Sequence, residues 1–288
     1  MREALLFGSD PELFITRPDG RVVAAHSVGI PYLDKSPEVV GGRYFRDGWA
    51  LELNPHPSEN PSELYKNIRN ILNNVRMILP KGHGFSSVPC TYIDLSLLND
   101  APDDVKEFGC NPAYDAYKMQ VTKPDVDAKT YPLRSLSGHL HFSGLPHLDN
   151  TDNYPDIIKF LDLYVGLPLS IIFSRKQQYE RRNFYGKAGE FRPQRYSSGT
   201  RGLEYRTPDA QVLNHPQIFL FALHASEWVL RHFPILKWDK SVEADLQEAI
   251  NKGDEKLQWK LLKEVSGICT ERMLRSIKKR DTRFILSI

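Results

Sequence analysis

Apolar and polar residues alternate in several short stretches of the chain, which is the pattern of half-buried β-strands. Asp10-Pro11-Glu12 separates the first two of these stretches, and the turn Pro18-Asp19-Gly20 leads into the third. We predict strands over residues 5–7, 13–15, 22–24, 49–54, 138–143 and 202–207.

Other stretches repeat apolar residues at three- and four-residue spacing, as amphipathic helices do. The spacing predicts a helix over residues 62–79, with Pro61 at its entry. A second helix begins at Pro155 and is expected to bend near Pro168, because a proline inside a helix removes a backbone hydrogen bond. A third covers residues 218–232. From Ser241 onward the pattern is helical again, with breaks at Gly253 and Gly267.

The strands and helices are mixed without a regular strand–helix–strand rhythm, which favours an α+β fold over a doubly wound sheet. We expect a curved antiparallel sheet with one polar, concave face and with helices on the other face. Residues 1–235 are predicted to form one domain. Residues 236–288 are predicted to form a helical C-terminal extension packed on it.

Composition narrows the class of protein. The chain has 288 residues and a formal net charge of only +2, so its overall charge does not favour nucleic acid as a partner. Cys90, Cys110 and Cys269 are far apart, which predicts a reducing cytoplasm and excludes a cysteine-based zinc site. The apolar run at residues 4–7 is too short for a signal peptide, and residues 157–173 are too short and too charged to span a bilayer. We expect a cytoplasmic protein without a membrane partner, and its oligomeric state stays open.

Four of the predicted strand regions share a second feature, which is a pair of polar residues two positions apart. Side chains at positions i and i+2 of a strand project from the same face, so several ionisable groups would gather on one side of the sheet. Such a face cannot be a dry core and is expected to hold a metal, a substrate or both. The pairs are Asp10 with Glu12, Glu52 with Asn54, His139 with His141, and Glu204 with Arg206.

The donor types suggest which ligands this face would bind. Most of the donors are carboxylates, which suits Mg²⁺ or Mn²⁺ better than zinc. Residues 175–206 then contribute nine lysines and arginines against three glutamates, interrupted by glycines. Arginine side chains match phosphate oxygens in two-point contacts. Carboxylates with a metal, next to arginines, are typical of phosphoryl transfer.

Each of these features also has a simpler interpretation. Asp10-Pro11-Glu12 alone is compatible with a solvated turn, and His139 and His141 with surface histidines on an edge strand. Glu204 and Arg206 are compatible with a surface ion pair of little energetic value. The basic stretch would equally suit a solvated face or a nucleic-acid patch. The aromatic residues Tyr179, Phe184, Tyr185 and Phe191 are predicted to be packing residues. The order of the motifs along the chain favours the functional interpretation.

In that order the motifs resemble the glutamine synthetase and glutamate–cysteine ligase superfamily. The resemblance rests on Gly8-Ser9-Asp10-Pro11-Glu12-Leu13-Phe14, on the strand at residues 137–143 and on the later Glu-x-Arg strand at residues 202–209. More closely, the strings at residues 47–54 and 185–187 resemble the small phage-type carboxylate–amine ligases, or amidoligases of type 2. The resemblance covers roughly residues 5–230 and does not include the helical tail.

The resemblance implies a role for each of the matching residues. The implied metal ligands are Asp10, Glu12, Glu52, His139 and Glu204. His141 matches a nucleotide-contacting histidine, and the implied phosphate-binding arginines are Arg182, Arg192 and Arg206. Arg175 and Lys187 are further candidates for the nucleotide. Asp47 either completes the metal carboxylates or contacts the substrate, as Asn54 would, and Glu52 and Asp47 are the candidates for the group that accepts the proton of the amine.

The resemblance further implies a glutamine-synthetase-like ligase that uses ATP and Mg²⁺ or Mn²⁺ to join a carboxylate to an amine through an acyl phosphate, in the host cytoplasm if the chain is phage-encoded. Three other functions stay open. They are a guanidino-kinase-like phosphotransferase, a non-catalytic phage or virion-associated binding protein on the same scaffold, and a metal-dependent nuclease. The carboxylate and the amine themselves are not identified by the sequence.

Overall fold

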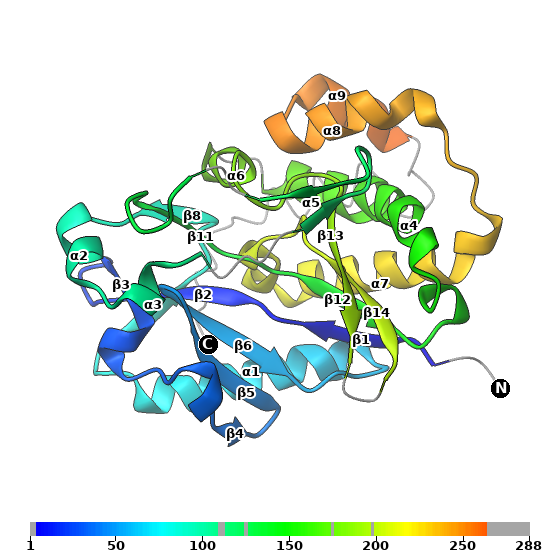
Figure 1. Ribbon diagram of the computed structural model, residues 1–288. Coiled ribbons are helices and arrows are strands. Elements are labelled where there is room, and N and C mark those ends of the chain that lie inside the picture. Colours follow the sequence, from blue (N-terminus) through cyan, green and yellow to red (C-terminus); the bar gives the residue numbers. More distant parts are fainter. Residues whose placement is uncertain (1–3, 109–112, 124–125, 174–175, 197–198, 264–288) are drawn as a thin grey trace.

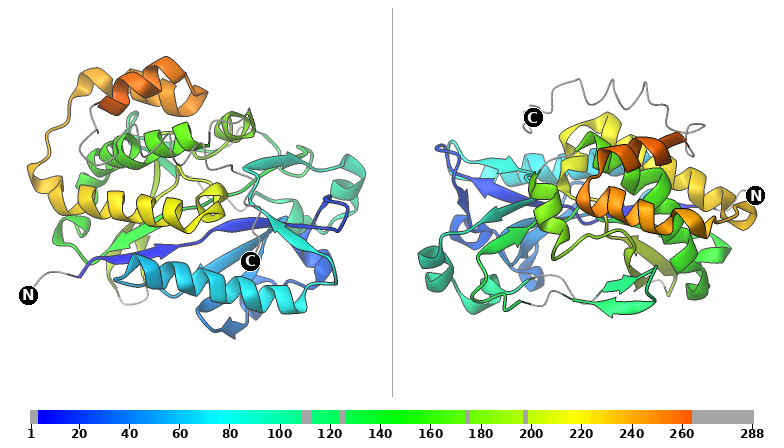
Figure 2. Two further views of the ribbon diagram at one scale, coloured as in Figure 1. Left: turned by 180° about the vertical axis from the view of Figure 1, so that it is seen from behind. Right: turned by 90° about the horizontal axis from the view of Figure 1, so that it is seen from above.

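The computed structural model describes residues 4–108, 113–123, 126–173, 176–196 and 199–263. Every strand pairing in this part of the chain is antiparallel. Helices cover the back of the sheets (Figures 1 and 2). The expected α+β class with antiparallel sheets is confirmed. The strands, however, are divided between two six-stranded sheets and a small two-stranded one, β11 (Leu133–Ser135) with β8 (Cys90–Tyr92).

The first sheet combines the N-terminal strand with strands from the middle of the chain. In spatial order it contains β1 (Leu6–Ser9), β12 (Leu140–Ser143), β14 (Arg201–Tyr205), β13 (Glu190–Arg195), β9 (Ala113–Asp115) and β10 (Gln120–Thr122). The predicted strands at residues 138–143 and 202–207 are therefore neighbours. Leu140 lies opposite Tyr205, and His141 lies opposite Glu204. This register brings the polar positions of the two strands together.

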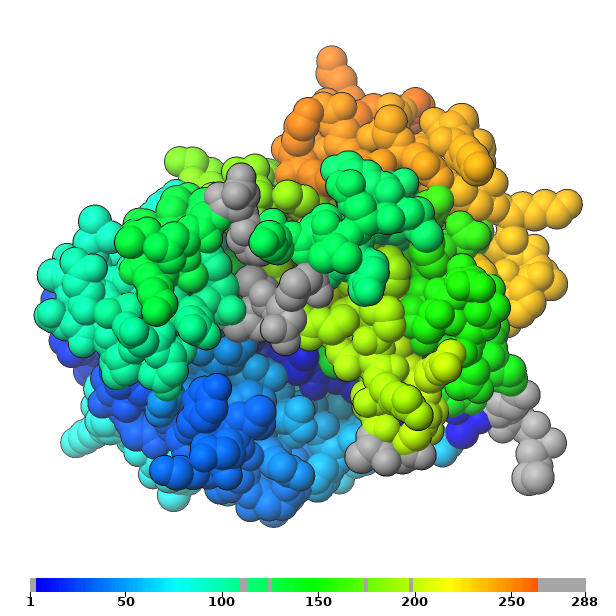
Figure 3. All heavy atoms as spheres, viewed as in Figure 1, coloured from blue at the N-terminus to red at the C-terminus, as the bar shows by residue number. Residues whose placement is uncertain are grey.

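The second sheet is built from the first 90 residues. It contains, in order, β3 (Val22–Val23), β2 (Glu12–Thr16), β6 (Ala50–Pro55), β5 (Gly42–Asp47) and β4 (Glu38–Val39), with β7 (Gly84–Ser86) also paired to β2. Glu12 lies directly opposite Glu52 across the β2–β6 pair. Figure 3 shows the N-terminal residues in blue and residues 100–205 in green to yellow-green meeting on one face of the molecule.

Asp10 and Pro11 join the two sheets, since β1 ends at Ser9 and β2 begins at Glu12. Proline has no N–H group to donate to a strand ladder, so the strand is interrupted here. The junction is fixed on both sides by backbone hydrogen bonds. Leu53 N–H donates to the Pro11 carbonyl at 3.0 Å, and Glu12 N–H donates to the Ser137 carbonyl at 3.0 Å. Asp10 thus faces the first sheet while Glu12 belongs to the second.

Long helices lie behind the strands and form the core with them. Helix α1 (Pro61–Ile78) begins where it was predicted, with the Asn60 side chain accepting from Ser62 N–H, and it packs on β5, β6 and α7 (Pro216–His232). Leu64, Ile68 and other apolar residues on its inner face are buried. Helix α4 (Tyr154–Leu161) packs on β13 and β14 and continues through a π-helical turn, η5 (Asp162–Gly166), into α5 (Leu167–Ile172). Pro168 is in the first turn of α5, close to the expected bend.

The remaining helices are short. They are α2 (Leu95–Asp100), α3 (Asp103–Lys106), α6 (Lys176–Arg182), the 3₁₀ turns η1 (Ala25–Val28), η2 (Leu33–Lys35), η3 (Pro146–Leu148), η4 (Thr151–Asn153), η6 (Ala210–Asn214), η7 (Phe233–Ile235) and η8 (Lys240–Val242), and the tail helices α8 (Glu243–Lys252) and α9 (Glu255–Leu262). None of the helices in the described ranges is long and apolar enough to cross a membrane.

The tail helices pack on α5 and α6 rather than standing apart (Figure 1). Gly253 ends α8 in the left-handed conformation, as the predicted break requires, whereas Gly267 is outside the described residues. Asn251 accepts a hydrogen bond from the Ala188 N–H group at 2.8 Å. The tail therefore holds the loop between α6 and β13, which also carries Tyr185.

Replacement of Asn251 with alanine should destabilise the protein by about 2 kcal/mol, because the buried Ala188 N–H group would lose its acceptor. Urea unfolding would measure the change in the free energy of unfolding. Lys252→Ala is the matched control, since its exposed side chain makes only a surface ion pair with Glu248. Equal losses in the two variants would contradict a specific role for Asn251.

Candidate active site

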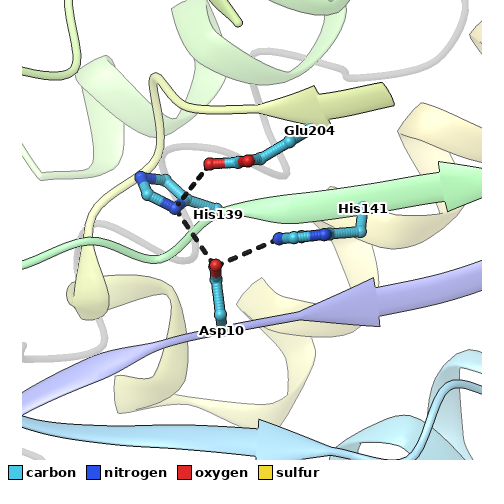
Figure 4. Close-up of side chains that lie close together, drawn as sticks. All are labelled: Asp10, His139, His141 and Glu204. Atoms are coloured by element: carbon cyan, nitrogen blue, oxygen red, sulfur yellow. Dashed lines mark ion pairs between the residues drawn. The ribbon is translucent and has the colours of Figure 1, made fainter. Parts of the chain in front are cut away.

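Four side chains from the first sheet and the junction form a compact cluster, which we call the histidine cluster: Asp10, His139, His141 and Glu204 (Figure 4). His139 Nδ1 lies 3.1 Å from Asp10 Oδ1 and 3.1 Å from Glu204 Oε1, and His141 Nε2 lies 3.2 Å from Asp10 Oδ1. The predicted convergence of the His139–His141 and Glu204 positions is therefore present in the structure.

Three donor atoms of this cluster, Asp10 Oδ1, His139 Nδ1 and His141 Nε2, converge on one another. They are buried, and their mutual contacts among the described residues lie at ion-pair distance without the geometry of a hydrogen bond. Buried polar atoms normally have a partner, because burying them without one is costly. Carboxylate oxygens and imidazole nitrogens that converge in this way fit a divalent cation as the shared partner.

Three further carboxylates, Glu12, Asp47 and Glu52, form a second group, which we call the carboxylate cluster. Glu12 and Glu52 face each other across β2 and β6, and Asp47 comes from the end of β5. Like charges directly opposite in a sheet repel each other, so this arrangement is unfavourable without a cation. An all-oxygen donor set suits Mg²⁺ or Mn²⁺. Asp47 thus belongs to the candidate metal ligands, which was one of its two predicted roles.

The pKa values of the carboxylate cluster reflect this crowding. Burial, together with the charges of Asp47 and Asp10, raises the pKa of Glu12 to about 8. Burial and the neighbouring carboxylates, Asp10 first among them, also raise the pKa of Glu52 well above its usual value. Burial and Asp10 raise the pKa of Asp47. Because the charge of Asp10 acts on all three residues, the two clusters are electrostatically linked.

The histidine cluster behaves differently because imidazole side chains lie beside its carboxylates. Burial would raise the pKa of Asp10, but His141 and His139 hold that pKa well below its usual value. Burial lowers the pKa of His139 to about 4, although Asp10 opposes the shift. A neutral imidazole is the form that binds a metal, so His139 is ready to act as a ligand.

Arginines contact the centre from the side of Glu204. Arg206 Nη1 forms a buried ion pair with Glu204 Oε1, and Arg192 Nη1 lies 3.4 Å from Glu204 Oε2. Arg206 Nη2 also donates to the Tyr185 hydroxyl at 2.8 Å, and that hydroxyl is hydrogen-bonded to His139 Nε2. Two of the three predicted phosphate-binding arginines are thus next to the histidine cluster.

The third predicted arginine, Arg182, does not lie at the histidine cluster, so its predicted role in binding phosphate there is corrected. The buried Arg182 guanidinium donates to the Ile250 carbonyl in α8, so it binds the tail instead. Successive positions on a helix face directions about 100° apart, and Arg181 rather than Arg182 faces the sheet. Arg181 donates to the carbonyls of Leu136, Thr207 and Pro208 behind the cluster.

The other predicted residues lie at the margins of the centre or outside the described residues. His141 was predicted to contact the nucleotide, but its Nε2 points into the histidine cluster as a candidate ligand. Asn54 is exposed and lies opposite Arg43, further along β6 than Glu52. Lys187 is half-buried, and Arg175 is outside the described residues. The nucleotide and substrate roles of Lys187, Arg175 and Asn54 stay predictions.

Sequence reasoning missed several residues that support the ligands. Tyr185 was predicted to pack, yet its hydroxyl joins His139 to Arg206. Gln194 donates to Glu204 Oε2, and the Ser137 N–H group donates to Glu12 Oε2 at 2.8 Å. Gln194 is two residues after Arg192 on β13, so the same period-two rule would have found it. The Tyr185 contact comes from a loop and has no such signal.

A protein-family model described as phage phiEco32-like COOH.NH2 ligase-type 2 matches residues 122–281. The match includes the helical segment after residue 235, which the resemblance inferred from the sequence did not cover. Among curated proteins, no sequence gives a significant match.

Solved structures with a similar arrangement include three proteins. A bifunctional glutathione synthetase from Pasteurella multocida has 15% identity and a TM-score of 0.40, over 96% of this chain and 46% of that chain. GmaS without ligand has 12% identity and a TM-score of 0.37, over 95% of this chain and 72% of that chain. A glutamine synthase homologue has 12% identity and a TM-score of 0.38, over 96% of this chain and 70% of that chain. The chain thus spans less than half of the first of these proteins.

The raised pKa of Glu12 predicts how stability depends on pH in the metal-free protein. A carboxyl whose pKa is higher in the folded state binds more protons there, so its contribution is full below pH 4.5 and is lost as the pH rises to about 8. Urea unfolding in the presence of a chelator should show this fall in the free energy of unfolding. Glu12→Gln should make the curve flatter between pH 5 and 8, and an unchanged slope would contradict the assignment.

A divalent cation should reverse that loss. Mg²⁺ or Mn²⁺ should raise the midpoint of thermal unfolding, by the equivalent of about 2.7 kcal/mol at a hundredfold excess over the dissociation constant. The increase should be larger at pH 8 than at pH 5.5, because the cation competes with protons. Glu52→Gln should reduce it, whereas the control Glu59→Gln, an exposed residue outside both clusters, should leave it unchanged.

Proposed function

The chain belongs to the family of phage phiEco32-like COOH.NH2 ligases of type 2, and on that premise we propose that it is an ATP- and Mg²⁺-dependent enzyme. In this proposal it forms an amide bond between a carboxylate and an amine through an acyl phosphate. The ligase class follows from the family. We propose the dependence on ATP and metal, the intermediate and the roles of individual residues.

The observation that supports this reaction best is the position of Glu204 between two kinds of group. Its Oε1 atom faces both His139 and Arg206, and its Oε2 atom faces Arg192. A divalent cation held by the two clusters would supply charge neutralisation for ATP phosphates. The arginines beside Glu204 would then contact phosphate oxygens next to that cation, where their two-point geometry suits a transferring phosphoryl group.

The residues of the site would act in two steps of the proposed reaction. The seven candidate ligand side chains would fix the phosphates relative to the carboxylate substrate. An oxygen of that carboxylate attacks the γ-phosphorus and ADP leaves, which activates the substrate because a free carboxylate is a poor electrophile. The amine nitrogen then attacks the carbonyl carbon, and inorganic phosphate leaves with the electrons of the broken C–O bond. A carboxylate must take the proton that the amine loses. Asp47 and Glu52 are our candidates, since burial raises the pKa of both carboxyls.

Tyr185 is assigned a positioning role in this site. Burial raises the pKa of its hydroxyl well above the usual value, so it stays a neutral phenol. It contacts both His139 Nε2 and Arg206 Nη2 and thereby fixes the distance between a metal ligand and a phosphate-binding group. A hydrogen bond to the far nitrogen of a metal-binding histidine also sets the orientation of its ring.

We also propose that residues 1–235 form the catalytic domain and that residues 236–288 form its extension. Helices α8 and α9 belong to the described part of that extension. The hydrogen bond between Asn251 and Ala188 suggests that this extension supports the loop carrying Tyr185. The need for ATP, together with the sparse cysteines, favours the cytoplasm as its place of action.

The proposal predicts ATP-dependent product formation that the arginines control. Hydroxylamine captures acyl phosphates as hydroxamates, so incubation with ATP, Mg²⁺, hydroxylamine and a panel of carboxylates should release ADP and yield a hydroxamate. Arg206→Ala should lower the rate by about 100-fold. Arg206→Lys should restore only part of it, because lysine lacks the fork of guanidinium donors.

The control for this experiment is Arg195→Ala, which removes an exposed arginine from the far end of the same β13–β14 hairpin. It should keep the wild-type rate, and circular dichroism should show that the variants are folded. A stable phosphorylated product without a hydroxamate would instead support a guanidino-kinase-like phosphotransferase. If calorimetry detects no ATP binding, the result would support a non-catalytic binding protein. Metal-dependent cleavage of DNA without ATP would support a nuclease.

A further inference from the structure

A pocket adjoins the carboxylate cluster, and one residue of its wall, Tyr185, also contacts His139. Glu12 and Asp47 of the cluster are part of this wall, which also includes Phe14, Trp49, Glu107, Phe108, Arg134 and Tyr185. A molecule in this pocket would lie directly next to the proposed metal centre. The pocket is therefore placed for a reactant rather than for a remote regulator.

The charge of the wall favours a positively charged occupant. Three carboxylates line the pocket, namely Glu12, Asp47 and Glu107, against the single guanidinium of Arg134. Glu12 and Asp47 would share their charge with a bound cation, whereas Glu107 is exposed and is not part of either cluster. A negatively charged group entering from solvent would first meet Glu107.

Arg134 does not offset this charge as a carboxylate receptor would, because its fork of donors is already used. Nη1 donates to the carbonyls of Tyr131 and Leu133 at 2.6 and 2.9 Å. Nη2 donates to those of Lys106 and Ala128 at 2.9 and 2.8 Å. An arginine has five N–H donors, of which four are on the Nη atoms, so the two-point contact with a substrate carboxylate is not available.

The aromatic residues of the wall indicate which cation would fit. Phe14, Trp49, Phe108 and Tyr185 line the pocket together with the carboxylates. Aromatic faces attract ammonium groups through their quadrupole and bury the methylene groups attached to them. The guanidinium groups of Arg181 and Arg206 already lie over the Tyr185 ring, and that of Arg134 lies over the Phe108 ring. The attraction for an ammonium group is therefore assigned to Phe14 and Trp49, and Phe108 is assigned to contacts with the methylene groups. Trp49 is 4% exposed, and its Nε1 has no hydrogen-bond partner among the described residues, so the wall also offers a donor to a bound molecule.

We propose that this pocket is the acceptor subsite and that it binds a primary amine carried on an aliphatic chain, in its ammonium form, in preference to free ammonia. The proposal rests on the proposed ligase function, because it assigns one of the two organic substrates of that reaction. The carboxylate substrate and ATP lie outside this pocket, on the side of the arginines.

The test uses butylamine as the probe and the full-length chain with saturating Mg²⁺, without ATP or a carboxylate. Butylamine should change the intrinsic tryptophan fluorescence in a saturable way, and Trp49→Phe should remove that change. Ammonium, butanol, butyrate and adenosine are the comparison probes. We expect butyrate to bind more weakly than butylamine by at least about tenfold, because it carries the same sign of charge as the wall. Ammonium and butanol should also bind more weakly than butylamine.

Two pairs of variants separate the charge from the aromatic wall. Glu107→Gln should weaken butylamine binding by about threefold, and the control Glu59→Gln should not change it. Phe108→Leu should weaken it by about threefold because the smaller side chain covers less of the butyl chain, while Phe108→Tyr should retain it. Thermal unfolding would verify that each variant is folded. Unchanged affinity in both Glu107→Gln and Phe108→Leu, or tighter binding of butyrate or adenosine, would overturn the proposal.

The outcomes for the pocket and for the ligase reaction can be told apart. Hydroxamate formation from ATP and a carboxylate does not require the acceptor subsite, since hydroxylamine is small and reactive enough to enter by itself. Hydroxamate formation without specific butylamine binding would count against the pocket assignment alone. Specific butylamine binding without any ATP-dependent product would count against the ligase proposal alone.

Discussion

Repulsion among half-buried carboxylates is the constraint on which the rest of the site depends. Asp10 belongs to the histidine cluster, and its negative charge adds to the effect of burial in raising the pKa of Glu12, Glu52 and Asp47. A protein can hold so many carboxylates in a poorly hydrated space only if they are protonated or if cations lie among them. At neutral pH the binding of cations among the carboxylates is the alternative that serves the proposed function, because it turns an unfavourable charge density into a site for metal-bound phosphates.

The fold supports this arrangement by fixing the backbone on every side of the charges. The Asp10-Pro11 junction is held by Leu53 and by the Ser137 carbonyl, so neither sheet can move away from the other without breaking hydrogen bonds. The Ser9 hydroxyl donates to the His139 carbonyl at 2.6 Å, which ties β1 to the strand of the histidines. Gly138 allows that strand to lie against residues 208–210, since a Cβ there would clash with the Asp209 carbonyl. Rigid elements of this kind keep ligands in place before a metal arrives.

Much of the site could be predicted because strand periodicity is a local property of the sequence. Polar residues two positions apart had to share a face, and the structure brings His139, His141 and Glu204 together as that rule required. The division into two sheets was not predicted, because the sequence does not specify which strands become neighbours across 130 residues. The position of Arg182 was wrong for a similar reason: a run of basic residues does not show which of two adjacent helical arginines faces the sheet. Tyr185 reaches the site from a loop, where no periodicity applies.

Glu204 shows why the metal side and the arginine side of the site form one unit. Its side chain is fully buried, and burial alone would raise its pKa, yet His139, His141 and Arg206 hold that pKa below the usual value. One oxygen faces His139 and Arg206, and the other faces Arg192 and Gln194. A cation bound at the first oxygen would compete with Arg206 for it, and this would make guanidinium donors available to an incoming phosphate. The same carboxylate would therefore couple metal binding to the recruitment of the arginines, without any movement of the backbone.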